Sequence, residues 1–295
     1  MKFAFVAAER VNHAVSTLCR VIGASRRGFY AWLHGAPARD RRQAGQAELE
    51  GHVDRLFSAN RCIYGSKRIH AALRREGRRH SERRVARTMR TLGLSARRGR
   101  KAAPRTTQSG HGLAPSPNLL GRRFEADRPD RIWLGDITYV PTGEGWLYLA
   151  TVKDMATRGI VGWAMADHLR ASLCQDALLM AIRQYRPEVG LIFHSDRGVQ
   201  YAETMYRAIL QRHGIRQSMS RCGNCLDNAP MESFFASLKI EMVHGAVFPT
   251  RDAAKAALFD YIEVFYNRRR LHSAIGYRTP SEARRDLTTD LAIAA

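Results

Sequence analysis

The sequence predicts an α/β protein with a mixed β-sheet, preceded by an all-α region. From residue 131 onward, three strand-like runs are followed by alternating helical and strand-like patterns. Before residue 96, apolar residues recur only at helical spacing. The charge divides in the same way: residues 1–128 hold 28 Lys and Arg against 9 Asp and Glu, whereas residues 129–295 hold 20 against 18. A strongly basic helical half joined to a nearly neutral α/β half is typical of a DNA-binding region attached to a catalytic one.

The overall composition sets the class of protein. A length of 295 residues indicates two or three domains. A net charge of +21 indicates a polyanionic partner, although a basic ribosomal or chaperone-like protein would share it. The apolar run at residues 3–8 is too short for a secretory signal, and no stretch approaches a membrane span. We therefore expect a cytoplasmic protein without a membrane partner.

Residues 1–45 form the first expected segment, a pair of helices. Val15, Leu18 and Ile22 have helical spacing, Gly23 ends the pattern, and Ser25 can cap a second helix. This is the length of a helix-turn-helix, and the base contacts would come from the start of its second helix, at Arg26 and Arg27. A helical hairpin that only packs on its neighbour remains the alternative.

Residues 46–95 form a second helix-turn-helix-like unit. Its apolar stripes belong to three helices, the last of which is capped by Ser81 and ends at Gly93. The opposite faces are rich in arginine and have few acidic partners, which indicates contact with DNA phosphates. The arginines expected to bind DNA are on the last helix: Arg83, Arg84, Arg87 and Arg90. Residues 96–128 lose all periodicity and predict a basic linker.

Residues 129–245 have the pattern of the mixed sheet. The expected strands cover residues 131–141, 146–154, 159–166, 191–195 and 215–219, and the expected helices cover residues 171–185 and 202–213. A last helix starts near Asn228, which can cap it, with Pro230 in its first turn. Residues 246–295 form a helical C-terminal extension.

Three acidic residues have the placement of a catalytic set. Asp136 lies within an apolar strand, Asp196 lies at the end of another, and Glu232 lies in the first turn of the last helix. Between Asp196 and Glu232 there are 35 residues. A carboxylate in an apolar strand is costly unless something pairs with it, and three converging carboxylates repel one another. Each acid taken singly could instead cap a helix or pair with an arginine.

A divalent cation would remove that repulsion. Hard oxygen ligands favour Mg²⁺, or Mn²⁺ in its place, and two such ions suit an in-line phosphoryl displacement. Asp136, Asp196 and Glu232 are therefore expected to be both the catalytic residues and the metal ligands. Lys239 follows Glu232 by seven residues, so both lie on one face of the helix, where a cation can hold a DNA end.

Four ordered motifs carry a resemblance to a known family. They are W-x-x-D-I-T-Y, H-S-D-R-G-x-Q-Y, D-N-A-x-x-E-S-F-F-x-x-L-K and Y-N-R-R-R-x-H-x-x-x-G-Y-x-T-P. Together they resemble the second-frame (OrfB) product of the IS-three family of insertion-sequence transposases, from about Leu18 almost to the C-terminus. The resemblance implies an RNase H-like, integrase-type catalytic core with a D-D-35-E site at Asp136, Asp196 and Glu232.

The same resemblance implies the reaction and its partners. Water would cleave a phosphodiester at the end of the element, and the freed 3′-OH would attack a second strand. It implies a copy-out, paste-in route through a joined-end circle, the element ends and target DNA as partners, the product of a preceding reading frame, and a homo-oligomer on DNA.

Three alternatives remain open. They are an RNase H-like nuclease that only hydrolyses, a non-enzymatic helix-turn-helix DNA-binding regulator, and a tyrosine recombinase using Tyr277. The last would leave the three acids without a role.

Overall fold

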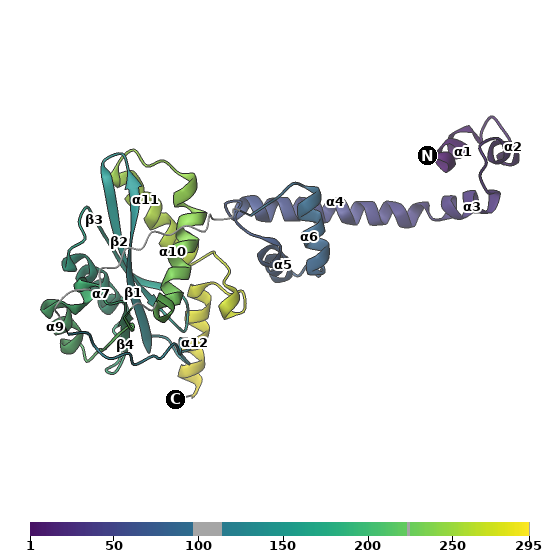
Figure 1. Cartoon of the computed structure of the whole chain (residues 1–295). Coiled ribbons are helices and arrows are strands. Elements are labelled where there is room, and N and C mark those ends of the chain that lie inside the picture. The colour runs from purple at the N-terminus through teal and green to yellow at the C-terminus, as the bar shows by residue number, and fades with distance from the viewer. Residues whose placement is uncertain (97–113, 223–224, 295) are drawn as a thin grey trace. The chain divides into compact units, whose positions relative to one another are not determined.

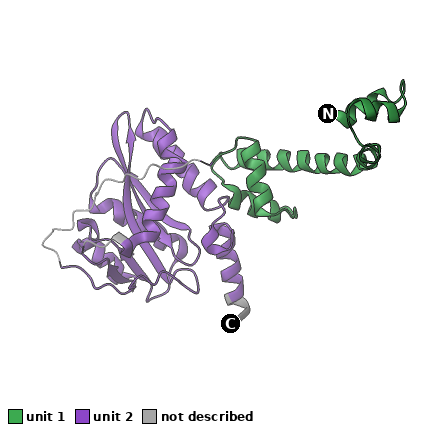
Figure 2. Cartoon of the chain, turned by 45° about the vertical axis from the view of Figure 1, so that its right-hand side comes forward, with its two compact units in different colours: residues 1–95 green, residues 96–295 purple. Residues whose placement is uncertain are grey.

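The computed structural model describes residues 1–96, 114–222 and 225–294 (Figure 1). Most of the expected basic linker, residues 97–113, lies outside these ranges. The chain divides into two compact units, Met1–Ser95 and Ala96–Ala295 (Figure 2). Within the described ranges, no helix has both the length and the apolarity needed to cross a membrane.

The smaller unit is entirely helical. Its helices are α1 (Lys2–Glu9), α2 (Val15–Val21), α3 (Arg26–His34), α4 (Ala36–Ala59), α5 (Ser66–Arg75) and α6 (Glu82–Thr91). Both expected serine caps are present: the Gly28 amide donates to Ser25 Oγ at 3.3 Å, and the Arg84 amide donates to Ser81 Oγ at 3.2 Å. These bonds satisfy amides that the first turn of a helix leaves free.

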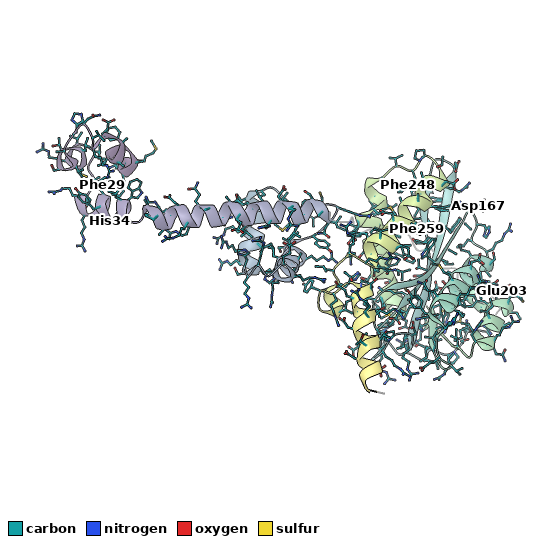
Figure 3. All side chains as sticks on the ribbon, turned by 180° about the vertical axis from the view of Figure 1, so that it is seen from behind. Phe29, His34, Asp167, Glu203, Phe248 and Phe259 are labelled. Carbon is teal, nitrogen blue, oxygen red and sulfur yellow. The ribbon has the colours of Figure 1, made fainter. Side chains whose placement is uncertain are left out.

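Two features of this unit differ from the expectation. Residues 3–8 are not merely an apolar run: they lie in α1, whose Val6 is buried in one cluster with Leu18 and Phe29. The labelled Phe29 marks this cluster in Figure 3. The expected boundary between residues 45 and 46 falls inside α4, a continuous helix of 24 residues. The first half of α4 has no apolar stripe and therefore no periodic signal.

The larger unit is built on a mixed sheet. Its strands are β1 (Ile132–Thr142), β2 (Gly145–Asp154), β3 (Ile160–Ala166), β4 (Ile192–Ser195) and β5 (Arg216–Met219). Their order in the sheet is β3-β2-β1-β4-β5. The pairs β3–β2 and β2–β1 are antiparallel, whereas β1–β4 and β4–β5 are parallel. This is the RNase H-like arrangement that the sequence predicts.

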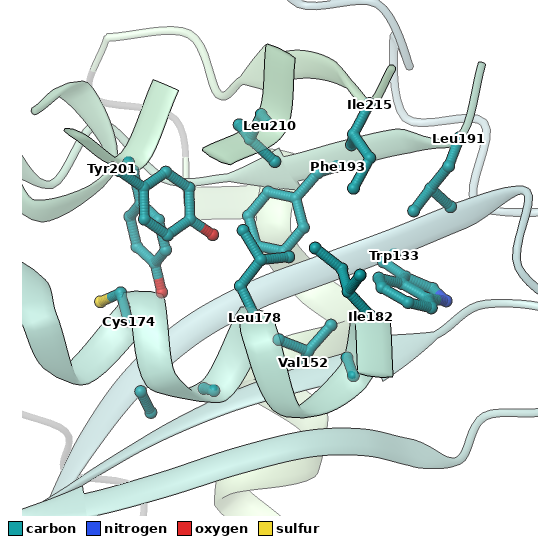
Figure 4. Close-up of a cluster of buried hydrophobic side chains, with 14 of the residues drawn as sticks. Trp133, Val152, Cys174, Leu178, Ile182, Leu191, Phe193, Tyr201, Leu210 and Ile215 are labelled. Carbon is teal, nitrogen blue, oxygen red and sulfur yellow. The ribbon is translucent and has the colours of Figure 1, made fainter. Parts of the chain in front are cut away.

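Helices cover both faces of this sheet (Figure 1). One face is covered by α7 (Ala171–Tyr185), α8 (Val199–Ala202) and α9 (Thr204–Arg212), and the other by α10 (Ala229–Glu241) and α11 (Arg251–Phe259). The expected helix at residues 202–213 is therefore two helices with a break at Glu203. Apolar side chains fill the space between the sheet and α7, among them Trp133, Leu178 and Phe193 (Figure 4). Gly162 permits this close packing, because a Cβ there would lie 2.2 Å from the Ala177 carbonyl oxygen.

The C-terminal segment packs back on the sheet. After α11 it forms a π-helix, Asp260–Tyr266, and ends in α12 (Pro280–Ala294). The Asn267 side chain exchanges two hydrogen bonds of 2.9 Å with the backbone of Ile160. Arg284 donates to both carboxylate oxygens of Asp130, at 2.7 and 2.9 Å. The motif Y-N-R-R-R-x-H thus begins in a segment that is bonded to the β3 edge of the sheet.

Candidate active site

Asp136 lies in the middle of β1, as expected, opposite Thr151 of β2. The strand next to β1 in the sheet, β4, pairs with β1 only as far as Leu134 and ends at Ser195. Beyond this point Asp136 lines a cavity of about 270 Å³ together with Asp196. The Ile137 amide donates to Asp136 Oδ1 at 2.8 Å. The strand therefore presents this carboxylate where the neighbouring strand has ended.

Asp196 follows directly after β4, and its Oδ1 accepts a 2.9 Å hydrogen bond from the Gly198 amide. The residue before the strand end, His194, is fully buried. Its Nδ1 lies 2.8 Å from Ser218 Oγ on β5, and its Nε2 lies 2.9 Å from the Asp227 carbonyl oxygen. His194 thus connects β4 to β5 and to the segment that leads into α10.

Glu232 lies in the first turn of α10 and is exposed. Asn228 is the N-cap residue of this helix, but the expected capping bond is absent, because its side chain accepts no amide of the first turn. The Asn228 side chain is buried, and neither of its polar atoms has a hydrogen-bond partner among the described residues. An Asn in the right position therefore does not guarantee the cap.

Asp227, in the same motif, serves a different purpose from the three acids. It is buried and accepts hydrogen bonds from Arg221, Arg122 and Asn118. The bond from Arg221, and then those from the Arg221 amide and Arg122, hold the pKa of Asp227 well below its usual range. A carboxylate committed to two guanidiniums organises the loop and is not a candidate metal ligand.

The electrostatics of Asp136 bring the three acids together. Burial raises the pKa of Asp136 well above its usual value, and the negative charges of Asp196 and Glu232 raise it further. The Ile137 amide and the Lys239 ammonium act in the opposite direction. Burial also raises the pKa of Glu232. The site thus holds carboxylates that resist ionisation and that a nearby cation would stabilise.

Lys239 lies on α10, the helix that carries Glu232. Its ammonium lies 4.8 Å from the centre of the Tyr139 ring, in the strand that carries Asp136. Burial lowers the pKa of Lys239, and the charge of Asp136 raises it. Through the described residues, no three His, Cys, Asp or Glu side chains form a ready-made metal site.

The arginines expected to contact DNA are exposed in the smaller unit. Arg26 and Arg27 start α3, and Arg83, Arg87 and Arg90 project from α6. Arg84 differs, because its guanidinium donates to Gln46 Oε1 and to the Gly45 carbonyl oxygen of α4, each at 3.2 Å. In this structure Arg84 joins two helices of the unit.

The sequence reading missed Lys153, near the end of β2. Its side chain is buried, and its ammonium donates to the Pro230 carbonyl oxygen in the first turn of α10 at 3.0 Å. The signal was the one that identified Asp136, a charged residue inside an apolar strand. The next residue, Asp154, accepts hydrogen bonds from the Thr157 amide and hydroxyl and so holds the turn that follows β2.

Comparison with known proteins identifies the family. Residues 126–225 and 232–286 match two families described as integrase core domains, and residues 44–102 match an HTH-like domain. The transposase InsF for insertion sequence IS3A of Escherichia coli K12 is 41% identical over 283 residues, which cover 96% of this chain and 98% of that protein. The chain belongs to this transposase family. It is therefore a transposase with an integrase-type catalytic core.

Other similar proteins include one further insertion-element product and two solved structures. The IS600 31 kDa protein of Shigella sonnei is 43% identical over 267 residues, covering 90% of this chain and 97% of that protein. A simian T-cell lymphotropic virus intasome has a TM-score of 0.45 at 18% identity, covering 79% of this chain and 74% of the other. The catalytic core of BIV integrase has a TM-score of 0.42 at 17% identity, covering 55% and 99%.

Proposed function

We propose that Asp136, Asp196 and Glu232 are the catalytic acids of this transposase and that they act in strand cleavage and strand transfer at the ends of an insertion sequence. The observation that supports this assignment is the convergence of the acids: Asp136 and Asp196 line one cavity, and the charge of Glu232 acts on Asp136. A carboxylate with two acidic neighbours is costly in a purely structural role.

The donor set fits a hard divalent cation. All three side chains offer carboxylate oxygens, and a bound cation would offset the repulsion between their negative charges. We propose that Asp136, Asp196 and Glu232 hold two Mg²⁺ or Mn²⁺ ions. When bound, these ions supply activation of the attacking hydroxyl and stabilisation of the leaving oxygen. The absence of a complete protein cage among the described residues suits Mg²⁺, which commonly takes its remaining ligands from water and substrate phosphates.

The residues of the chain supply position and charge. Backbone amides fix Asp136 and Asp196, the first at Ile137 and the second at Gly198. Lys239 adds a cation beside Asp136 and can hold the terminal strand after cleavage. In this way the new 3′-OH remains in line with a second phosphate, which joining requires and simple hydrolysis does not.

The smaller unit supplies DNA binding in this proposal. The exposed arginines Arg26, Arg27, Arg83, Arg87 and Arg90 lie on helix-turn-helix-like segments, whereas Arg84 serves partly to hold α4. The proposed partners are the element ends, the target DNA, a second copy of this chain on DNA and the product of a preceding reading frame. The proposed compartment is the cytoplasm. The proposed domains remain 1–45, 46–95, 96–128, 129–245 and 246–295.

The test uses the full chain and a duplex that carries the end of the element, taken from the flanks of its gene. Asp136→Asn, Asp196→Asn and Glu232→Gln should each lower Mg²⁺-dependent cleavage roughly 1000-fold, because a lost ligand removes several kcal/mol of transition-state stabilisation. DNA binding should stay within about twofold, because the phosphate contacts lie elsewhere. Asp176→Asn, an exposed acid on α7, is the matched control and should cleave normally. Full cleavage by an acid variant, or in excess chelator, would contradict the assignment.

Joining separates the transposase from two of the alternatives, the nuclease and the DNA-binding regulator. Lys239→Ala should impair joining of a pre-cut end at least as much as first cleavage. A wild-type protein that cuts but never joins, even with the preceding-frame product present, would instead be a nuclease. A protein that binds the end without cutting it would be a regulator.

A further inference from the structure

Lys153 is a charged side chain inside the larger unit. Its exposed fraction is 5%, and its ammonium makes two contacts with α10. It donates a 3.0 Å hydrogen bond to the carbonyl oxygen of Pro230, and it lies 5.9 Å from the centre of the Phe234 ring. These two residues flank Glu232 along the helix. Lys153 therefore contacts the turn of α10 that carries Glu232.

The sheet places Lys153 in a fixed relation to Asp136. In the antiparallel pair, Lys153 lies opposite Leu134 and Thr151 lies opposite Asp136. Because opposed residues share a face and strand side chains alternate, Lys153 and Asp136 point to the same face, two register positions apart. On the other side of β2 the register shifts between Val152 and Lys153. Such irregularities redirect a side chain and are frequent beside active sites.

The position is an expensive one for a lysine. Burial, together with the charges of Arg158 and Arg270, lowers the pKa of Lys153 to about 7. An apolar side chain of similar length would avoid both the desolvation and the repulsion. Apolar packing has no direction, however, whereas an N–H···O hydrogen bond fixes the distance and angle between its partners.

We propose that Lys153 is a positioning residue that fixes the first turn of α10, and hence Glu232, against the sheet face that carries Asp136. The proposal rests on the proposed function of these two acids. Without the bond, α10 keeps its apolar face on the sheet but can slide or rotate along it. Small displacements of this kind separate Glu232 from Asp136 without unfolding the protein.

The test compares Lys153→Met, which keeps the length of the side chain, with the full-length wild type. Cleavage of the element end should fall about 100-fold, the effect of a misplacement near 1 Å. The Mn²⁺ concentration that half-saturates a rise in melting temperature should increase about tenfold, and this second readout requires no activity. DNA-end affinity should be unchanged. Lys153→Gln keeps a donor on a shorter side chain and should fall between the two.

Ser237→Ala is the matched control, because it removes a 3.3 Å hydrogen bond from Arg270 to the same helix, away from its first turn. It should match the wild type within about twofold in both readouts, since Arg270 keeps its ion pair with Glu241 and the first turn of the helix keeps its bond to Lys153. Wild-type cleavage and an unchanged Mn²⁺ midpoint in Lys153→Met would overturn the proposal. So would a loss of cleavage with no change in that midpoint. If Asp136→Asn still cleaves, the proposed function itself fails, whatever Lys153→Met does.

Discussion

The ion pair between Arg270 and Glu241 joins the C-terminal segment to the end of α10. The two side chains have exposed fractions of 6% and 8%, and their shortest contact is 2.6 Å. Glu241 also accepts a 2.7 Å hydrogen bond from the Tyr261 hydroxyl. Burial by itself lowers the pKa of the Arg270 guanidinium. The hydrogen bonds and the negative charge of Glu241 outweigh this effect, so that the pKa lies above its usual value. Removing Arg270 therefore takes from the buried Glu241 the guanidinium that bonds to both of its carboxylate oxygens.

Arg270→Met should lower the free energy of unfolding of the larger unit by about 3–5 kcal/mol, the usual cost of breaking a buried pair. The triple variant Arg270→Met, Glu241→Met and Tyr261→Phe removes both charges of the pair and the tyrosine hydroxyl that bonds to Glu241. It should recover most of that loss, to within about 2 kcal/mol of the wild type, because apolar replacements of similar volume avoid the desolvation of both ions.

The assay is urea unfolding followed by tryptophan fluorescence. Trp133, Trp146 and Trp163 lie in the larger unit, whereas Trp32 lies in the smaller one. A Trp32→Phe background therefore reports the larger unit alone. A loss below about 1 kcal/mol in Arg270→Met would refute the reasoning, since an exposed pair is worth that little. A triple variant as unstable as Arg270→Met would refute it as well.

Two further predictions concern pH and salt. The pKa of Lys153 is lowered to about 7 in the folded protein. Between that pH and the ordinary lysine pKa, the unfolded chain therefore binds more protons than the folded protein, and the free energy of unfolding rises with pH. The wild type should gain roughly 2 kcal/mol between pH 7 and 9 relative to Lys153→Met, as urea midpoints can show; an equal or falling difference would contradict the burial argument. Replacing both Arg87 and Arg90 by Ala should reduce the slope of log K against log salt by about 2 for DNA binding, with Arg212→Ala on α9 as an exposed control. An unchanged slope would remove α6 from the DNA interface.

Strand positions were the most predictable part of the fold. The first strand was expected at residues 131–141 and is Ile132–Thr142, and the third was expected at 159–166 and is Ile160–Ala166. Apolar runs that end at a glycine or a carboxylate predict strands well. The apolar run reflects the burial of the strand, and the glycine or carboxylate marks where the chain leaves the core. The first half of α4 was not predictable, because an exposed polar helix has no stripe to detect.

The candidate site was predictable only in part, for a related reason. Asp136, Asp196 and Glu232 could be proposed from the sequence because an acid inside an apolar strand, at a strand end or in the first turn of a helix is conspicuous in its local sequence. The role proposed for Lys153 could not be predicted, because its partner is a backbone carbonyl group 77 residues away. Every residue has such a carbonyl group, so the amino-acid sequence does not indicate which one accepts the bond. Arg270 and Glu241 likewise meet across 29 residues of chain.

Both ends of α10 are therefore held by basic side chains from other segments, Lys153 at the first turn and Arg270 at the last. An apolar core would bind this helix as strongly or more strongly, but it would tolerate small rotations that cost little packing energy. Under the proposed assignment Glu232 has no such tolerance, because its position relative to Asp136 decides whether the two acids can act together. A buried lysine and a buried arginine are costly for stability, and the proposed positioning of the helix by hydrogen bonds of fixed geometry explains why α10 has both.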